Sequence, residues 1–150
     1  MPVTNAEAVT WWHAIRRYLI VLGLGNLLWE ALHMPLYTVW YEGTTGQIVL
    51  YGLHCTGGDI LIGLSALMAS LLIFGDAAWP ARNYRRVAVV AISLGVAYTV
   101  FSEWDNVYVT ESWAYAPAMP TILGIGLSPV AQWGVIPGLA FWSARKASFR

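Results

Sequence analysis

Four long apolar segments dominate this sequence, and they restrict the chain to a membrane-spanning fold. They cover residues 18–37, 56–74, 87–104 and 121–142. A helix that crosses the hydrocarbon core of a bilayer needs about 20 mostly apolar residues, and each segment approaches that length. The connections between them are short, so 150 residues leave no room for a second domain. The sequence predicts a single all-α domain, an integral membrane bundle of four antiparallel helices.

The shortage of charge leads to the same conclusion. Charged residues make up 11% of the chain, whereas they make up about 25% of a typical soluble domain. This composition excludes a disordered chain and a nucleic-acid binder with a basic stripe. The single cysteine, Cys55, rules out an internal disulfide and is expected to be a small packing residue. We also expect no secretory signal peptide, since no small-residue cleavage site follows the first segment. The expected partner is the lipid bilayer, and no nucleic acid.

The basic residues lie on one side of the predicted membrane. They precede the first segment, separate the second from the third and follow the fourth, and the other two connections contain none. Basic residues are retained in the cytoplasm, so both termini and the middle loop are predicted to be cytoplasmic. In a bacterium this is an inner-membrane protein, with Glu42, Asp105 and Glu111 on the periplasmic side. The basic residues are Arg16, Arg17, Arg82, Arg85, Arg86, Arg145, Lys146 and Arg150.

Polar side chains inside the segments recur at helical spacing. Each ionisable group there costs about 2.5–3.5 kcal/mol on insertion scales, so such groups usually face the interior of a bundle. Polar positions in the first segment are four, three and four residues apart, which places them on one helix face, and the third segment carries a similar stripe. The first stripe is Asn26, Glu30, His33 and Tyr37, and the second is Thr99, Ser102, Glu103 and Asn106.

A common depth connects polar residues from all four segments. A rise of about 1.5 Å per residue, counted from the cytoplasmic ends, places five of them about 20–25 Å up, in the outer third of the membrane. These five are Glu30, His33, Asp59, Glu103 and Gln132. We therefore predict a polar pocket open toward the outer surface, with residues 113–120 folded back over it. His54 lies nearby, and the other candidate ligand-binding residues are Asn26, Tyr37, Asp105, Asn106 and Trp113.

Two kinds of chemistry fit such a pocket. Glu30, His33, His54 and Glu103 are candidate ligands for zinc, copper or iron. Glu30 and His33 have the i, i+3 spacing of di-iron carboxylate bundles, although those bundles use the motif twice and it occurs once here. Alternatively, two carboxyl groups buried close together share a proton, and Glu30 or Glu103 acts as a catalytic acid.

Structural roles are the competing interpretation for the same residues. His54 fits an interfacial hydrogen-bonding role, and Gln132 fits a contact that holds helices together. Asp59 is a candidate helix N-cap, with Thr56 as a rival. Aromatic residues near the segment ends are expected to form interfacial belts. They are Trp11, Trp12, Trp40, Tyr41, Tyr51, Trp79, Trp104, Tyr108, Trp113 and Tyr115.

Three motifs occur in order near the C-terminal end: W-D-N at 104–106, W-A-Y-A-P at 113–117, and a proline at 129. This quarter of the chain resembles the membrane-integral lycopene cyclase domain of bacterial and fungal carotenoid synthesis. That family shows W-D-N, then W-x-Y/W-x-P, then a span that opens with Pro-Leu-Glu-Glu. Its paired glutamates, thought to carry the acid chemistry, correspond here to Ala131 and Gln132. The resemblance implies a carotenoid or isoprenoid cyclase or isomerase that uses another carboxylic acid, Glu30 or Glu103.

The whole chain also resembles a family of small four-span membrane proteins from proteobacteria. The similarity lies in LHCTGGD at 53–59, FSEWDNV at 101–107, SWAYAPAMP at 112–120 and GLSPVAQW at 126–133. It implies a bacterial host and adds no mechanism.

Three functional hypotheses follow. The first is a membrane-embedded site that binds a metal ion, a small molecule or an apolar ligand, with or without catalysis. The second is the cyclase or isomerase described above. The third is a non-enzymatic subunit of a larger membrane complex or a homo-oligomer, in which the polar layer only joins helices. Its contact face would consist of small residues, namely Gly57, Gly58, Gly63, Ala66 and Ala69.

Overall fold

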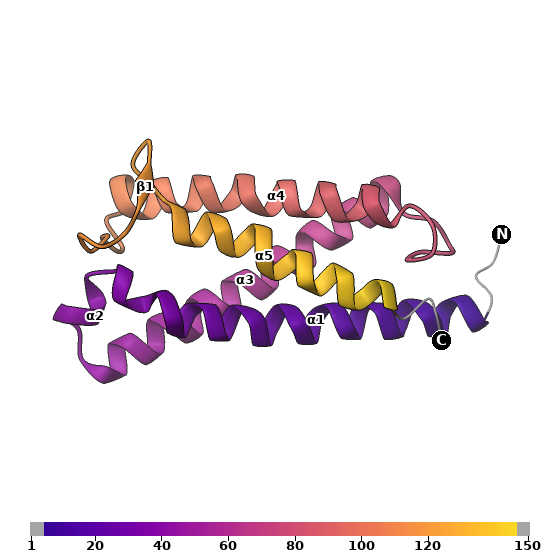
Figure 1. Ribbon diagram of the computed structural model, residues 1–150, viewed down its shortest axis with the longest axis horizontal. Helices are drawn as coiled ribbons and strands as arrows, with labels where there is room; N and C mark the ends of the chain where they lie inside the picture. The colour runs from indigo at the N-terminus through magenta and orange to yellow at the C-terminus, as the bar shows by residue number, and fades with distance from the viewer. Residues whose placement is uncertain (1–4, 147–150) are drawn as a thin grey trace.

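Four long helices form the body of the protein and alternate in direction (Figure 1). The computed structural model describes residues 5–146. The long helices are α1 (Asn5–His33), α3 (Thr45–Phe74), α4 (Tyr84–Trp104) and α5 (Leu127–Arg145). Helices α1 and α4 each pack against both α3 and α5. The predicted all-α fold is confirmed.

Among the described residues, three helical segments are long and apolar enough to cross a membrane: Thr10–Leu36, Thr45–Phe74 and Tyr84–Val109. Many of their outward-facing side chains are large and apolar, such as Leu32, Leu61 and Leu72. Water would disfavour such a surface, whereas lipid accommodates it. The structure thus supports a membrane protein with three candidate spans. Helix α5 lies beside them, and its role as a fourth span is a proposal taken up below.

Two helices begin more than ten residues earlier than predicted. Helix α1 begins at Asn5 rather than residue 18, and α3 begins at Thr45 rather than residue 56. At α3 the cause is a capping box. The Thr44 hydroxyl accepts from the Gln47 backbone N–H at 3.3 Å, while the Gln47 side chain accepts from the Thr44 N–H at 2.8 Å. The suggested N-cap roles of Asp59 and Thr56 are therefore wrong, because both residues lie well inside α3.

The fourth predicted segment is only partly helical. Residues 121–126 form a hairpin of β1 (Thr121–Ile122) and β2 (Ile125–Gly126). Leu123 and Gly124 make the turn, with positive φ values of 51° and 80°. A two-residue hairpin turn requires this left-handed backbone. The helical prediction is wrong for these six residues, and α5 starts only at Leu127.

Short elements build the end of the bundle on the left in Figure 1, which we name the outer end after the side of the membrane expected for it. A 3₁₀ turn, η1 (Met34–Leu36), and the short α2 (Val39–Glu42) follow α1. A wider π-helical turn, η2 (Asp105–Val109), extends α4. The chain then runs back across η1, as two backbone hydrogen bonds show: Thr38 N–H to Ala114 O and Ala116 N–H to Leu36 O, each 2.9 Å. Residues 113–120 thus fold back over this end, as predicted.

The apolar core lies in the other half of the bundle. Its largest buried side chains are Tyr18, Leu22, Leu67, Trp79 and Phe141. Trp79 is fully buried, so its assignment to an interfacial belt is wrong. The basic residues gather at this same end, except that Arg150 lies outside the described residues. Buried polar side chains are concentrated in the opposite, outer half.

The small-residue face suggested for a partner is divided in the structure. Gly63 and Ala66 are buried, and a side chain added at Gly63 would collide with Leu22 of α1. Gly57 and Gly58 have open space beside them. The face as predicted is therefore not available to a partner, because Gly63 already packs against α1 and Ala66 is buried within the bundle.

Candidate functional site

One cavity of about 280 Å³ lies within the outer half of the bundle. At roughly 30 Å³ per water, it has room for about nine waters or a small organic molecule. Residues from α1, α3, α4 and α5 line it, together with the segments that close the outer end. The lining includes the whole predicted layer: Glu30, His33, Asp59, Glu103 and Gln132, together with His54. That these residues bind a ligand stays a prediction, but the structure brings them to one place.

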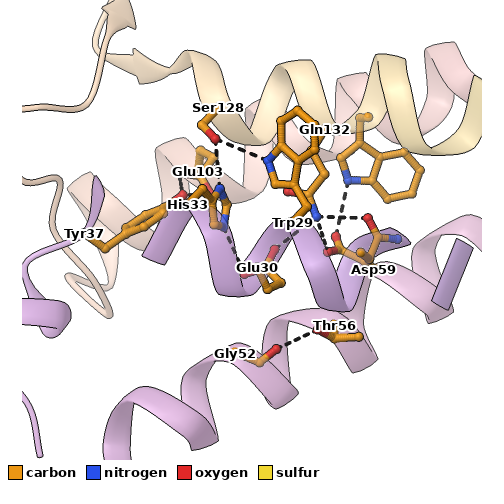
Figure 2. Close-up of polar contacts among 12 residues, drawn as sticks. Trp29, Glu30, His33, Tyr37, Gly52, Thr56, Asp59, Glu103, Ser128 and Gln132 are labelled. Carbon is orange, nitrogen blue, oxygen red and sulfur yellow. Dashed lines mark hydrogen bonds and ion pairs between the residues drawn. The ribbon is translucent and has the colours of Figure 1, made fainter. Parts of the chain in front are cut away.

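Gln132 is the centre of the layer (Figure 2). Its side-chain nitrogen lies 2.9 Å from Asn26 Oδ1, 3.0 Å from Glu30 Oε1 and 2.9 Å from Asp59 Oδ2. An amide nitrogen carries two hydrogens, so it cannot donate fully to three acceptors at once. Trp133 supplies another donor, with its indole N–H 3.3 Å from Asp59 Oδ1. Two carboxyl groups from α1 and α3 therefore share one amide from α5.

His33 is fixed on both sides of its ring. Its Nε2 lies 3.0 Å from Glu30 Oε2, and its Nδ1 lies 3.0 Å from the Ser128 hydroxyl. Trp29 also donates to that hydroxyl, at 3.3 Å. Figure 2 shows this chain of contacts from α1 to the first turn of α5. A metal ion would have to displace Glu30 or Ser128 to reach either ring nitrogen.

The predicted metal ligands do not form a metal-binding group. Within residues 5–146, no three His, Cys, Asp or Glu side chains are arranged to hold a metal ion. His54 is exposed on α3, whereas His33 is buried between α1 and α5. The i, i+3 spacing of Glu30 and His33 instead produces a direct contact between them. The structure thus gives the metal hypothesis no support from geometry.

Glu103 occupies the outer side of the cavity and is held by tyrosines. The Tyr115 hydroxyl donates to Glu103 Oε2 at 2.6 Å, and the Tyr37 hydroxyl lies 3.3 Å from the same atom. The backbone N–H of Gly126 donates to Tyr115 Oη at 2.9 Å. The pKa of Tyr115 is raised, mainly by burial and secondly by the hydrogen bond to Glu103. The phenol therefore stays protonated and donates at neutral pH. The hairpin and the fold-back segment thereby fix this carboxyl group.

Some predicted residues take other positions. Asn26 is buried and contacts Gln132, but it does not line the cavity. Asp105 is half-buried on η2 and is likewise not a lining residue. Asn106 does line it, and its side-chain nitrogen donates to the Ser102 carbonyl at 2.8 Å. Trp113 lines it as well, with a buried indole N–H that has no hydrogen-bond partner.

Four residues in the polar network were not predicted as site residues: Trp29, Tyr115, Ser128 and Trp133. Tyr115 was assigned to an interfacial belt, which is wrong because its hydroxyl joins Glu103 to Gly126. Tyr115 belongs to the W-A-Y-A-P motif, so this motif could have indicated that Tyr115 is a site residue. Ser128 lies about one helical turn before Gln132 on α5, and Trp133 follows Gln132 directly.

Acidic side chains outnumber basic ones in the lining of the cavity. Its lining contains three carboxyl groups and two imidazoles, and among the described lining residues there is no Lys or Arg. Buried carboxylates are stable only when a cation, a proton or several hydrogen-bond donors compensate them. The network supplies neutral donors from Gln132, Trp133, Tyr115 and Tyr37. The cavity therefore favours protons or a positively charged ligand group over an anion.

Comparison with protein-family models, with curated proteins and with solved structures found no match for this chain.

Proposed function

We propose that this chain is an inner-membrane protein with four antiparallel spans and both termini in the cytoplasm. Helix α5 would be the fourth span, because it packs against α1 and α4 along the bundle. The basic residues of the described chain gather at one end, and the cavity lies in the other half. Under the positive-inside rule, the cavity then lies toward the periplasmic face.

The cavity binds a small, largely apolar ligand that carries one cationic or hydrogen-donating group. The observation behind this is that Glu30, Asp59 and Glu103 surround one cavity whose described lining has no Lys or Arg. The remaining lining includes apolar side chains such as Met34 and Ile62. Pockets for small molecules typically combine apolar walls with a few polar groups that set orientation. Its volume of about 280 Å³ limits the enclosed part to a small molecule or one end of a longer one.

Binding of matched probes tests this proposal. The detergent-solubilised protein is titrated with octylamine, octanol and octanoic acid, which share a chain length and differ in the polar group. We expect octylamine to bind most tightly and octanoic acid least, and we expect Glu103→Gln to weaken octylamine binding on the order of 10-fold. Glu111→Gln, an exposed residue of the outer loop, is the control. Equal binding of the amine and the acid, or no effect of Glu103→Gln, would contradict the proposal.

A metal ion is the competing occupant. Zinc, copper or iron would require Glu30, His33, His54 and Glu103 to give up their present positions. Elemental analysis of the purified protein distinguishes the two cases. If the protein contains a stoichiometric metal, and the metal is lost in His33→Ala but kept in the control His13→Ala, then the cavity binds a metal ion and not an organic ligand.

A second candidate is acid catalysis on a polyene or isoprenoid. The observation that favours it concerns Gln132, which the resemblance to the lycopene cyclase domain aligns with one of that family's paired glutamates. Its side-chain nitrogen contacts Glu30 and Asp59, so carboxyl groups from α1 and α3 lie beside this residue. A proton shared by this pair would make one of them the acid. A long polyene would place only one end group in the cavity.

A lycopene-accumulating host tests this second candidate. The expected result is a change in carotenoid products that disappears in Glu30→Gln and persists in Glu42→Gln, an exposed outer residue. Unchanged lycopene beside an active control cyclase would exclude lycopene as the substrate.

A further inference from the structure

A second hollow, of about 550 Å³, lies at the opposite end of the bundle. Its lining residues belong to the loop between α3 and α4, the first turn of α4 and the end of α5. These segments lie on the right in Figure 1. Its lining is Pro80, Ala81, Asn83, Tyr84, Arg85, Arg86 and Arg145. This basic hollow shares no residue with the outer cavity.

Three guanidinium groups and no acid line the basic hollow. Arg85 and Arg86 are exposed, and no Asp or Glu is among the residues that line the hollow beside them. The charges of Arg85 and Arg86 are therefore not balanced by a carboxylate. Arg145 lies over the Tyr84 ring, 5.2 Å from its centroid. Arginine fixed in this way is well suited to planar, two-point contacts with phosphate.

The start of α4 adds to this positive field. The N-cap residue Asn83 has left-handed backbone angles and makes no side-chain bond to the first turn. The first backbone N–H groups of α4 thus receive no cap from its side chain, and they carry the positive end of the helix dipole. An anion in the hollow would lie beside Arg85 and Arg86 at the start of α4, where the helix dipole also favours negative charge.

We propose that the basic hollow binds the phosphate group of an anionic phospholipid in the cytoplasmic leaflet. Both helices carry exposed apolar side chains close in sequence to the arginines, with Val89 one turn after Arg85 on α4 and Leu139 and Trp142 before Arg145 on α5. A lipid whose phosphate lies among the arginines can therefore place its acyl chains along α4 and α5. Lys146 lies over Trp142, 3.4 Å from the ring centroid, a pairing suited to the headgroup region. Basic pockets at the cytoplasmic ends of spans are suited to anionic headgroups.

Native mass spectrometry of the full chain in detergent tests this assignment. The probes are phosphatidylglycerol, phosphatidylcholine and inorganic phosphate. The test variant is the double substitution Arg85→Gln with Arg86→Gln. The matched control is Arg16→Gln with Arg82→Gln, which removes the same charge from two exposed residues that do not line the hollow. Circular dichroism shows whether each variant keeps its helices.

The expected result is one tightly retained phosphatidylglycerol per chain, preferred over phosphatidylcholine and not displaced by millimolar inorganic phosphate. The test variant should weaken binding about 30-fold, since each basic residue contributes roughly a factor of five near a charged headgroup. The control variant should change it less than about 3-fold. Displacement by inorganic phosphate, with the same variant sensitivity, would overturn the lipid in favour of a soluble phosphate. Equal loss in both variants, or no preference for phosphatidylglycerol, would overturn the site itself.

Discussion

Gln132 shows how much of the polar layer depends on one side chain. Its nitrogen is the donor nearest to oxygens of Asn26, Glu30 and Asp59. Without it, two carboxyl groups in the interior of the bundle would lose a shared donor, and the amide of α5 would no longer join α1 to α3.

We predict that Gln132→Leu destabilises the fold by about 2–3 kcal/mol, because it leaves buried acceptors without a donor. Thermal unfolding in detergent measures the change. Ala131→Leu, an apolar substitution at the exposed neighbouring position, should change stability by less than about 0.5 kcal/mol. Equal effects of the two substitutions would show that the amide contributes nothing beyond its volume.

Tyr115 makes stability depend on pH at the alkaline end. The raised pKa of Tyr115 means that the folded state holds its phenol protonated. Its contribution to stability is therefore complete below about pH 10, the ordinary pKa of tyrosine, and is lost as the pH rises above that value. We predict that Tyr115→Phe flattens this alkaline loss, as followed by unfolding midpoints between neutral and alkaline pH. Tyr108→Phe, which alters a more exposed phenol, is the control. An unchanged alkaline slope in Tyr115→Phe would refute the assignment.

At the scale of residues, the sequence was enough to predict which carboxyl groups lie together, but not which side chains form hydrogen bonds with them. Counting residues from the basic ends located Glu30, Asp59, Glu103 and Gln132 at one depth, because helical rise is uniform. It could not find Tyr115, since a loop has no period from which to infer the position of a side chain. Asp105 was also predicted as a site residue, but it does not line the cavity, whereas its neighbour Asn106 on the same π turn does.

At the scale of elements, the contact between α4 and α5 sets the position of Trp133. Gly95 of α4 lies directly against the Trp133 ring, and a side chain there would overlap it. Because Trp133 also donates to Asp59, this close approach of two helices extends to the cavity.

We predict that Gly95→Ala destabilises the protein by about 1–3 kcal/mol through this overlap. It should also weaken octylamine binding, because it moves the indole from Asp59. Unfolding midpoints and probe titration measure the two effects. Gly134→Ala, where an added Cβ meets nothing within 4 Å, should be neutral or slightly stabilising, since Ala favours helix over Gly. If Gly95→Ala leaves the stability unchanged, then α4 and α5 can move apart with little loss of free energy, and the prediction is wrong.

Hydropathy located the helices but misplaced several of their ends. Apolar length predicts a span and says little about where its helix begins. The start of α3 depends instead on Thr44 and Gln47, two polar residues outside the predicted segment. The hairpin at 121–126 escaped prediction because Ile122, Leu123 and Ile125 are as apolar as any span residue. The turn depends on the backbone freedom of Gly124.

At the scale of the whole molecule, the two ends of the bundle differ in chemistry. The described arginines gather at one end, where the apolar core lies, and the buried acids lie in the other half. This asymmetry is the physical basis for the proposed orientation.

We predict that cysteine labelling will report both termini on the cytoplasmic side. In a Cys55→Ala background, Glu111→Cys should react with a membrane-impermeant maleimide in intact cells. Ala81→Cys should react only after lysis, because it belongs to the basic loop. The reverse pattern would invert the orientation and would place the cavity toward the cytoplasm.

The fold-back segment over the cavity has a consequence for how a ligand enters. Its attachments are mainly hydrogen bonds: two backbone bonds to Leu36 and Thr38 after α1, the bonds of Tyr115 with Glu103 and Gly126, and the bond from Leu127 N–H to Pro120 O. The bundle depends on a separate apolar core. Breaking a few hydrogen bonds requires much less free energy than separating packed helices. Local opening of residues 113–120 can therefore admit a guest while the rest of the protein stays folded, so the rate of entry and the stability of the fold are set by different parts of the chain.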